Sequence, residues 1–500
     1  MNLTMLLEMV AEAAPDRAVV GTRQRQLTAA ELLGRVDQAA TRIGATDAEH
    51  VAWVGLNSDA YPVALLAAAK AGKPFAPVNY RLPDEQLVSV LRRLVPCVVV
   101  AGPEVAARIG DVDGLEIWSE SDLTGPTGSA SDEAPDEVGF VDPEEIAVLL
   151  FTSGTTGEPK AAVLRHRHLV SYVISSIEFL GADEDDAQLV SVPPYHIAGI
   201  SSVLSSLYSG RRLVYLPSFD AEDWVRTAAA ERVTHAMVVP TMMGRVLSII
   251  EDEGVDLSSL RHLSYGGGRM PIELIERAMK LLPHVNFVNA YGLTETSSTI
   301  TVLGPDDHRA AVDSIDPEVR RRLGSVGRPL DSVELEIRDA EGRPLGPGER
   351  GEICVRGEQV AGEYLGKRVI DDDGWFATND AGHLDAEGFL FLDGRLDDVI
   401  VRGAENLSPG EIEDVLLSHP GVQEAAVVGV PDAEWGEAVA AAVVLDPNQD
   451  VSADELRQWV REQLRSTKTP DRIEFRDELP YSETGKLLRR VIRQDLSDPL

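Results

Sequence analysis

Residues 146–160 read IAVLLFTSGTTGEPK, an apolar run followed by a loop of glycine and hydroxyl residues that ends on Lys160. The apolar run is typical of a buried strand, and Gly154 and Gly157 permit backbone angles that bring a chain close to phosphate oxygens. Hydroxyls and successive backbone N–H groups in such a loop can form an anion cradle. The spacing does not match the P-loop G-x-x-x-x-G-K-[ST]. An ordinary polar loop is the alternative at this point.

The sequence around this loop alternates between strand and helix patterns. Between 50 and 120, the runs HVAWVGL, PFAPVN and PCVVVAG alternate with the helical stretches AYPVALLAAAKAG and DEQLVSVLRRL. A second series follows, with strands expected near LVSVPP, RLVYLP, HAMVVP, HLSYGG and NFVNAY. Such alternation predicts parallel α/β units. Residues 119–138 are acidic and rich in Ser, Gly and Pro, which predicts a solvated loop.

The pattern of expected strands and helices changes twice in the last third of the chain. From about 324 to 394, short strands are separated by Gly- and Pro-containing turns, which indicates a β-rich subdomain. Residues 411–475 then read helix, strand, strand, helix, strand, enough for a small α+β domain. We therefore expect an α/β protein with a large N-terminal domain at 1–394 and a C-terminal domain at 395–500.

The charge balance limits the partners. The 83 acidic residues outnumber the 46 Lys and Arg residues, giving a net charge of −37. This charge argues against nucleic acid and against anionic membrane surfaces. A polyanion such as ATP can bind only where local positive groups and a cation overcome that field.

The two cysteines, Cys97 and Cys354, provide no disulfide framework or metal cluster, and a reducing cytoplasm fits best. No apolar run approaches the roughly 18 residues of a membrane span, so we expect none. The N-terminus carries Glu8 and Glu12 within an apolar stripe, which indicates an amphipathic helix at a domain edge and argues against a signal peptide. Oligomeric state, monomer or homodimer, is left open.

Six further stretches carry candidate chemistry. They are PPYHIAG at 193–199, YGGGRMP at 265–271, NAYGLTETS at 289–297, WFATND at 375–380, GRLDD at 394–398 and YSETGKLLRR at 481–490. Glu295 offers the carboxylate that Mg²⁺ prefers beside phosphates, and the Asp380 oxygens can accept ribose hydroxyls. Each stretch alone has an ordinary structural alternative, such as a tight turn, a packed histidine or a flexible tail.

In this order and spacing, the stretches resemble the adenylate-forming superfamily, which includes acyl-CoA synthetases, luciferase and the adenylation domains of peptide synthetases. The resemblance spans about 50–490. PVNYRLP at 77–83 and VGRPL at 326–330 look most like its fatty-acyl-CoA and aryl-CoA ligases.

The resemblance implies roles for individual residues. ATP would be held by Thr152, Ser153, Gly154, Thr155, Thr156, Gly157, Lys160, Gly266, Gly267, Gly268, Asn289, Ala290, Tyr291, Gly292, Thr294, Asp380, Arg395 and Lys486. Thr152 and Glu295 would hold Mg²⁺. The catalytic set would be Lys486, Glu295, Thr294 and His196, with Lys486 bridging the substrate carboxylate and the α-phosphate. An apolar acyl pocket would be lined by His196, Ile197, Gly199, Met242, Met243, Tyr265 and Thr296.

The resemblance also implies a mobile C-terminal domain that turns about Asp397 between two half-reactions. The first forms an acyl adenylate from ATP and a hydrophobic carboxylic acid, and the second transfers the acyl group to the thiol of CoA. The CoA arm would pass Gly403 and Ala404, where relatives usually carry two glycines. Because Ala404 adds a methyl group there, a carrier-protein thiol or an amine is an alternative acceptor. A catalytically silent binding protein is a remote alternative.

Overall fold

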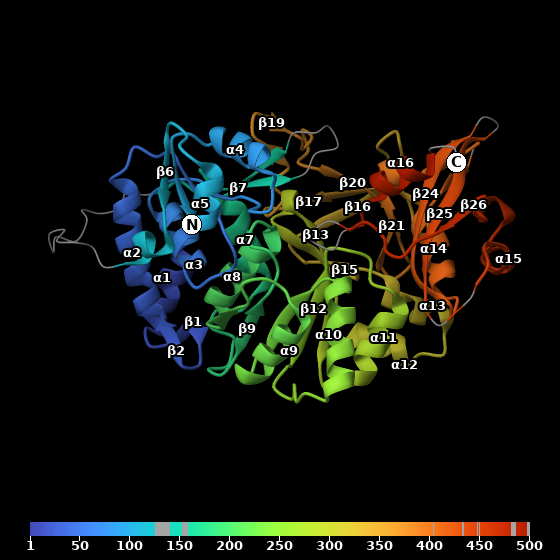
Figure 1. Cartoon of the computed structure of the whole chain (residues 1–500), viewed down its shortest axis with the longest axis horizontal. Helices are drawn as coiled ribbons and strands as arrows, with labels where there is room; N and C mark the ends of the chain where they lie inside the picture. The colour runs from blue at the N-terminus through green and yellow to red at the C-terminus, as the bar shows by residue number, and fades with distance from the viewer. Residues whose placement is uncertain are drawn as a thin grey trace.

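Two large β-sheets with helices on their faces form most of the molecule (Figure 1). This computed structural model describes residues 1–125, 141–152, 159–403, 405–432, 435–447, 449, 451–481 and 487–497. The mixed α/β architecture, with a smaller α+β part at the C-terminal end, is the predicted fold class.

The first sheet has eight strands and carries the predicted phosphate loop. In spatial order its strands are β19 (Lys367–Arg368), β18 (Glu363–Tyr364), β8 (Lys160–Arg165), β7 (Ile146–Thr152), β4 (Phe75–Pro77), β3 (His50–Val54), β5 (Cys97–Ala101) and β6 (Leu115–Trp118). Strands β7, β4, β3, β5 and β6 are parallel, as the alternating pattern predicts. Strands β8, β18 and β19 extend the sheet in antiparallel pairs.

The second sheet has nine strands. They are β15 (Arg328–Pro329), β14 (Ser298–Leu303), β13 (Asn286–Leu293), β12 (His262–Gly266), β11 (His235–Val238), β9 (Ala187–Val190), β10 (Arg212–Tyr215), β1 (Ala18–Thr22) and β2 (Arg25–Thr28). The six strands from β13 to β1 are parallel, and the outer pairs at both ends are antiparallel. The carboxyl ends of β12 and β13 therefore meet at one edge, where ligands bind in open α/β sheets.

Helices cover both faces of the two sheets. The α-helices of the N-terminal part are α1 (Thr4–Ala13), α2 (Ala29–Gly44), α3 (Tyr61–Lys70), α4 (Asp84–Arg92), α5 (Pro103–Ile109), α6 (Glu120–Thr124), α7 (His166–Ser176), α8 (Ile197–Ser209), α9 (Ala221–Ala230), α10 (Pro240–Glu253), α11 (Ile272–Leu281), α12 (Pro305–Asp313) and α13 (Pro317–Arg320). The short 3₁₀ segments are η1 (Thr294–Thr296), η2 (Arg321–Gly324), η3 (Leu396–Asp398) and η4 (Ser466–Lys468). None of the helices in the described part of the chain is long and apolar enough to cross a membrane.

The largest hydrophobic core lies between the two sheets and joins their inner faces through α1, α2, α3 and α8. Helix α3 is apolar on all sides, and every residue from 61 to 69 is buried, as expected for a helix enclosed in a core. A second core packs α9, α10 and α11 on the outer face of the nine-stranded sheet. A third packs α4 and α5 on the outer face of the eight-stranded sheet.

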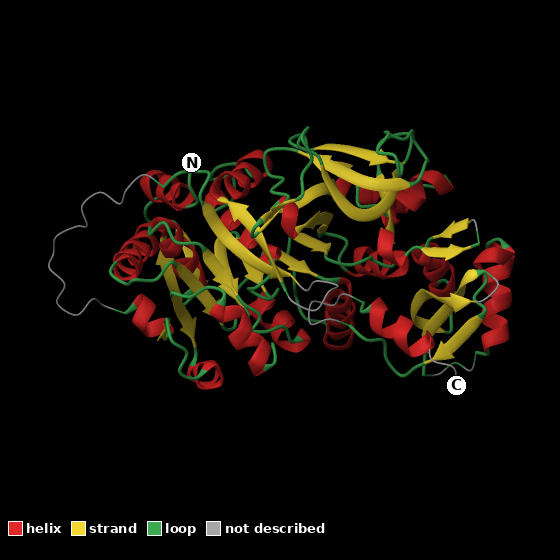
Figure 2. Cartoon of the chain, turned by 90° about the horizontal axis from the view of Figure 1, so that it is seen from above, coloured by secondary structure: helices red, strands yellow, loops and turns green. Residues whose placement is uncertain are grey.

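The β-rich part is an antiparallel sheet of β16 (Glu334–Arg338), β17 (Gly351–Arg356), β20 (Phe376–Leu384) and β21 (Leu390–Arg395). Beyond it lies a five-stranded sheet of β22 (Ile400–Arg402), β23 (Glu405–Leu407), β24 (Val422–Asp432), β25 (Gly436–Leu445) and β26 (Arg472–Phe475), with helices α14 (Pro409–Leu417), α15 (Ala453–Gln463) and α16 (Arg489–Ser497). Its two cores contain only residues from 400 to 496, and Figure 2 shows this part as a separate group at the right. The predicted boundary between 394 and 395 is consistent with these cores and stays a prediction.

Among the described residues, several polar contacts join the C-terminal part to the rest of the molecule around α14, and one of them is the ion pair of Arg350 with Glu411 at 3.7 Å. The Arg269 guanidinium donates to the carboxylate of Asp414 on α14. The Ser408 hydroxyl, at the N-cap of the same helix, donates to the carbonyl of Asp393 at 2.8 Å. A domain that is attached by few polar contacts can change its position relative to the rest of the chain.

One local prediction was wrong. The segment 119–138 was expected to be a loop throughout, but residues 120–124 form α6. The hydroxyl of Ser119 accepts the backbone N–H of Asp122, whose carboxylate accepts the N–H of Ser119. This reciprocal capping satisfies two N–H groups at the helix start, and the acidic composition of the segment concealed it. Residues 126–140 lie outside the described residues.

We expect Gly327→Ala to destabilise the protein more than Gly348→Ala. Both glycines have positive φ, +78° and +80°, so both substitutions carry a left-handed strain of about 1–2 kcal/mol. A Cβ at Gly327 would also lie 1.9 Å from the Val302 carbonyl oxygen, whereas nothing lies within 4 Å at Gly348. This clash adds about 1–3 kcal/mol. Urea-unfolding midpoints measure the difference, and equal midpoints would contradict the packing described between β14 and β15.

Candidate functional site

The predicted phosphate loop connects the two strands of a β-hairpin. Strands β7 and β8 are antiparallel, and Thr152 pairs with Lys160 across the hairpin. The Thr152 hydroxyl donates to the Lys160 carbonyl at 3.4 Å. The loop itself, 153–158, lies outside the described residues. The phosphate contacts predicted there, which stay predictions, are Ser153, Gly154, Thr155, Thr156 and Gly157.

Glu295 lies just beyond the carboxyl end of β13, in η1 with Thr294. Its side chain is buried, with the residue only 8% exposed. The Glu295 carbonyl accepts the N–H groups of Ala361 at 2.8 Å and Gly362 at 3.1 Å. Oε1 of its carboxylate accepts the hydroxyl of Tyr364. Main chain and side chain are therefore both fixed by the segment that leads into β18.

Tyr364 is a site residue that the sequence reasoning missed. Burial, followed by the negative charge of Glu295, raises the pKa of Tyr364 well above its ordinary value, so the hydroxyl stays protonated and donates. The Nζ of Lys160 lies 5.8 Å from the centre of the Tyr364 ring. The glycines on either side, Gly362 and Gly366, were the available signal, but they indicate a turn as readily as a site.

A second carboxylate, the partly buried Asp380, lies where β20 pairs with β21. The Tyr291 hydroxyl donates to Asp380 Oδ2 at 2.6 Å, and Arg395 Nη1 donates to Oδ1 at 2.7 Å. Burial, followed by the Asp380 charge, raises the pKa of Tyr291, so this hydroxyl also stays protonated. Since each carboxylate oxygen can accept about two hydrogen bonds, each oxygen of Asp380 keeps one position for a ligand hydroxyl.

The structure explains the glycines at 266 and 267 by two different constraints, and it shows no constraint at 268. A Cβ at Gly266 would lie 2.3 Å from the Ala290 carbonyl oxygen, because β12 and β13 pair at that position. Gly267 has a φ of +74°, which favours glycine. A Cβ at Gly268 would meet Pro240 only at 3.7 Å, an ordinary contact. Neither the nearby atoms nor the backbone angle therefore requires glycine at 268.

Three other residues predicted to contact ATP have structural roles on β13. The side-chain amide of Asn289 is buried and donates to the Ser325 carbonyl at 2.9 Å. The Ala290 carbonyl is the group that approaches Gly266. A Cβ at Gly292 would lie 1.8 Å from the Ser298 carbonyl oxygen. The polar group of Asn289 thus points into the protein, and its contact with ATP stays a prediction.

The three sheets of the N-terminal part meet around these groups. The eight-stranded sheet contributes Lys160 and Tyr364, the nine-stranded sheet Tyr291 and the Glu295 segment, and the β-rich sheet Asp380 with Arg395. The described residues contain no cluster of three His, Cys, Asp or Glu side chains placed for a metal ion. A single buried carboxylate fits Mg²⁺, which is usually held by one or two carboxylates together with substrate phosphates.

Comparison with known proteins then identifies the family. The model of the AMP-binding enzyme family matches residues 7–365, and that of the AMP-binding enzyme C-terminal domain matches residues 411–486. The chain belongs to the AMP-binding enzyme family. The resemblance inferred from the motifs is thereby confirmed.

Three members of known name are similar to the chain in sequence or structure over nearly its whole length. It is 33% identical over 493 residues to a feruloyl-CoA synthase from Amycolatopsis sp, covering 97% of both chains. The amide bond synthetase McbA from Marinactinospora thermotolerans has a TM-score of 0.87 at 28% identity, covering 99% of this chain and 100% of its own. The o-succinylbenzoate CoA synthetase from Bacillus subtilis, solved with its acyl adenylate, has a TM-score of 0.82 at 28% identity, covering 99% and 98%.

Six of the seven predicted acyl-pocket residues of this AMP-binding enzyme fall into two groups. Ile197 and Gly199 lie at the start of α8, after His196 at the N-cap. The His196 ring packs 5.0 Å from the ring of Tyr195. Met242 and Met243, on α10, belong to the same buried cluster as Tyr265. Their shared lining of one pocket stays a prediction.

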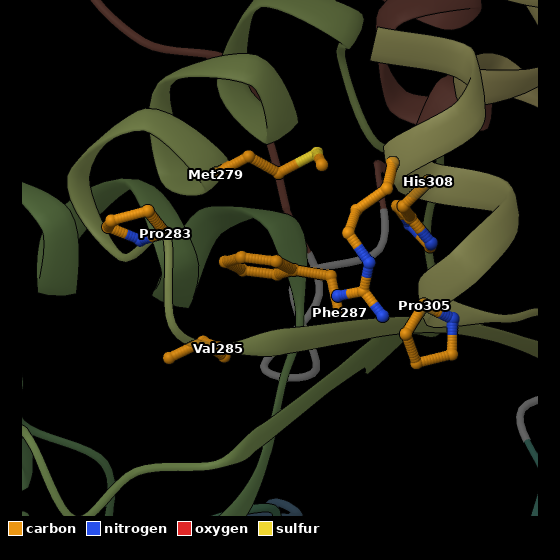
Figure 3. A pocket seen from close by; sticks show the side chains of 7 residues that line it. Met279, Pro283, Val285, Phe287, Pro305 and His308 are labelled. Carbon is orange, nitrogen blue, oxygen red and sulfur yellow. The ribbon is translucent and has the colours of Figure 1, made fainter. Parts of the chain in front are cut away.

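Two of these residues make contacts that the prediction did not include. The Tyr265 hydroxyl bonds to His308 Nε2 at 2.8 Å. His308 borders a cavity of about 30 Å³ beneath α11 and α12, and Figure 3 shows Met279 and Phe287 across it. That cavity holds about one water molecule, so it cannot be an acyl site.

The Thr296 hydroxyl is fully buried and bonds to main-chain groups of Leu293 and Ser298.

Gln359 is a second residue that the sequence reasoning missed. Its side-chain amide donates to the carbonyls of Thr296 at 3.1 Å and Thr299 at 2.8 Å, and the residue is fully buried. Between these carbonyls, Ser297 and Ser298 have φ values of +56° and +116°. Non-glycine residues in such conformations persist only where the surroundings hold them, and they concentrate at functional sites. Gln359 provides that restraint directly behind Glu295.

The predicted hinge contacts the site through Asn379. Asn379 adopts a φ of +61°, a conformation that Asn tolerates better than most non-glycine residues. Its Nδ2 donates to Asp397 Oδ2 at 3.0 Å. Gly403 has a φ of +64°, and its N–H donates to the Trp435 carbonyl at 2.7 Å. Ala404 and Lys486 lie outside the described residues, so their predicted roles stay predictions.

Gly268→Ala should leave the fold intact and weaken ATP binding, whereas Gly266→Ala should lower stability. The first substitution meets no protein atom closer than 3.7 Å, and the second meets a backbone oxygen at 2.3 Å. We expect ATP affinity of Gly268→Ala to fall by about 10-fold or more, consistent with about 1–3 kcal/mol for an added methyl group in a close contact. Calorimetric titration together with thermal unfolding separates the two effects. Unchanged ATP affinity in a folded Gly268→Ala protein would show that no ligand approaches this glycine.

Proposed function

We propose that this AMP-binding enzyme is an ATP- and Mg²⁺-dependent acid–thiol ligase that activates a fatty or aromatic carboxylic acid and passes it to CoA. The observation that supports this most strongly is the convergence of the phosphate-loop hairpin, the buried carboxylate of Glu295 and the Asp380–Arg395 pair. These groups suit the phosphates, the cation and the ribose of ATP, respectively. The relatives named as CoA synthetases provide the reaction class.

In the proposed first half-reaction, a carboxylate oxygen of the acid attacks the α-phosphorus of ATP. The bond between the α-phosphorus and the bridging oxygen breaks, and pyrophosphate leaves with that oxygen. Such transfers depend on positioning and charge neutralisation. Lys160 would contact the phosphates and Asp380 the ribose hydroxyls. Mg²⁺, held by Glu295 and Thr152, would neutralise charge on the phosphates.

In the proposed second half-reaction, the CoA thiolate attacks the acyl carbonyl, the carbon–sulfur bond forms, and AMP leaves. The C-terminal part would turn about Asp397 between the two steps, in keeping with its separate cores and its few polar contacts to the rest of the chain. An amine acceptor is the second candidate, because the amide bond synthetase is as similar in fold as the CoA synthetase. Ala404 is the residue that favours this alternative.

Mass spectrometry of products tests the proposal. The enzyme is given ATP, Mg²⁺ and one acid at a time, drawn from fatty acids from acetate to stearate, benzoates and cinnamates. Each acid is run with CoA, with a simple amine, and with neither. Acyl-CoA in the CoA reactions alone supports the ligase and identifies the acid. Acyl adenylate that accumulates and does not react with CoA would favour amide formation or carrier-protein loading as the function. The Ala404→Gly variant then tests whether the methyl group of Ala404 prevents the reaction with CoA.

We expect Lys486→Ala to reduce adenylate formation by roughly 100- to 1,000-fold while the protein stays folded, because it removes a preorganised positive group from the developing charge. Lys367→Ala, at an exposed position on β19, is the matched control and should behave as the wild type. Acid-dependent exchange of pyrophosphate into ATP measures the step. Equal rates in both variants would remove Lys486 from the mechanism.

Asp397→Pro should retain adenylation and lose thioester formation, because proline restricts the backbone change that a hinge must absorb. Asp397→Ala removes the carboxylate and its bond to Asn379 but keeps the backbone free, so we expect it to support both steps. Adenylation is followed by pyrophosphate exchange and the second step by consumption of isolated acyl adenylate with CoA. An equal loss of both steps in Asp397→Pro would contradict the hinge.

The cytoplasm is the proposed location. Cys97 and Cys354 are both buried and unlinked, as expected for thiols in a reducing compartment. The fatty or aromatic acid and CoA are the proposed small-molecule partners. A role in fatty acid metabolism would follow only from a fatty acid as the preferred substrate.

A further inference from the structure

At the candidate site, a side-chain hydrogen bond joins the two large sheets. Tyr364 belongs to β18, the second strand from one edge of the eight-stranded sheet, and Glu295 follows β13 of the nine-stranded sheet. The Tyr364 hydroxyl donates to Oε1 of Glu295. We propose that Tyr364 is the positioning residue of the cation site, and that its hydroxyl holds the Glu295 carboxylate so that Oε2 is presented to the metal. This inference rests on the proposed role of Glu295.

The position of Tyr364 is itself fixed by strand pairing. Tyr364 pairs with Ala162 of β8, and the N–H of Leu365 donates to the Ala161 carbonyl at 2.8 Å. The neighbouring Glu363 accepts two hydrogen bonds from the Arg165 guanidinium, at 3.0 Å and 2.8 Å. This forked ion pair anchors a strand of only two residues. The hydroxyl is therefore held at a defined place relative to the phosphate-loop hairpin, of which β8 is one arm.

The main chain of Glu295 is restrained separately from its carboxylate. The N–H groups of Ala361 and Gly362 fix the Glu295 carbonyl, but they leave the three side-chain torsions free. Among the described residues, the hydrogen bond to Tyr364 is the one that restrains the carboxylate, and it uses Oε1. A ligating carboxylate usually depends on such an outer partner, and removal of the partner typically weakens metal binding by 10- to 100-fold.

Lys160 also lies close to Tyr364. Its Nζ lies 5.8 Å from the centre of the Tyr364 ring, on the side of β8 where the phosphate loop ends. Tyr364 thus touches the proposed cation ligand with its hydroxyl and approaches a proposed phosphate contact with its ring. Phenylalanine preserves the ring and the pairing of β18, and it removes only the bond to the carboxylate. The two contributions can therefore be separated by one substitution.

The test compares metal binding in Tyr364→Phe and Tyr291→Phe. Each variant loses one hydroxyl that donates to a carboxylate of the site, Glu295 in the first and Asp380 in the second. ATP affinity is measured by calorimetric titration with Mn²⁺ as the probe and again with EDTA, and free Mn²⁺ is followed by its paramagnetic resonance signal. We expect Tyr364→Phe to bind Mn²⁺–ATP roughly 10- to 100-fold more weakly, with little change in EDTA. Tyr291→Phe should weaken ATP binding equally in both conditions.

Glu295→Gln separates this inference from the proposed function. If Glu295→Gln weakens Mn²⁺–ATP binding while Tyr364→Phe does not, the cation ligand stands and the positioning role is overturned. If Glu295→Gln has no effect, the proposed cation site itself fails. In the double variant, Tyr364→Phe should add nothing to Glu295→Gln, because the carboxylate it positions is already lost. An additive loss would assign Tyr364 a general structural role.

Thermal unfolding of each variant checks that the loss is local. Should Tyr364→Phe fail to fold, Glu363→Gln replaces it, because it breaks the forked ion pair with Arg165 that anchors β18 and keeps the Tyr364 hydroxyl. Weaker Mn²⁺–ATP binding, with little change in EDTA, is then expected. No loss, or an equal loss with and without EDTA, in a folded Glu363→Gln protein would overturn the positioning role.

Discussion

The hydrogen bond from Tyr364 to Glu295 joins the two large sheets at the place where the candidate site forms. Glu295 lies just beyond β13, which pairs in parallel with β12, and Tyr364 lies on β18, which pairs antiparallel with β8 and β19. The buried carboxylate needs a donor, since an unsatisfied buried carboxylate is strongly disfavoured. That requirement fixes how the edge of one sheet meets the end of the other, and it places the hairpin from β7 to β8 beside Glu295.

The remaining parts of the site follow from this junction. The β-rich sheet adds Asp380 and Arg395, which are cross-strand partners on β20 and β21, and Tyr291 links them back to β13. The C-terminal part contacts Arg269 through Asp414 of α14, and Asp397 of η3 accepts a hydrogen bond from Asn379, the neighbour of Asp380. Such a site, assembled from three sheets beside a separate C-terminal sheet, would suit the proposed reaction in two steps, because the proposed nucleotide contacts could stay in place while the C-terminal part moved.

Much of this organisation is predictable from the sequence. The alternation of apolar runs and helical stretches indicated both parallel sheets, and the spacing of the glycine-rich motifs identified the family before any comparison. Tyr364 and Gln359 could not be found in this way, because their partners at 295–299 lie some 60 residues away in sequence. Their contacts depend on how the segment 359–364 lies against η1 in the folded chain, which local periodicity does not encode. Helix α6 was missed because an acidic composition concealed a capping pattern.

The three glycines at 266–268 show what the structure adds to a sequence pattern. Sequence patterns indicate that Gly266, Gly267 and Gly268 matter, but only the structure separates a close neighbouring strand from a left-handed backbone and from an open surface. The residue that structure leaves unexplained, Gly268, is then the best candidate for direct contact with a ligand.

The central claim is that the Glu295 carboxylate, held at the junction of the two sheets, is required for activation of an acid by ATP. Acid-dependent exchange of labelled pyrophosphate into ATP measures that step without reference to the acceptor. The account predicts exchange in the wild type that requires both Mg²⁺ and the acid, and a loss of at least about 100-fold in a folded Glu295→Gln protein. Exchange at the wild-type rate in that variant would contradict it.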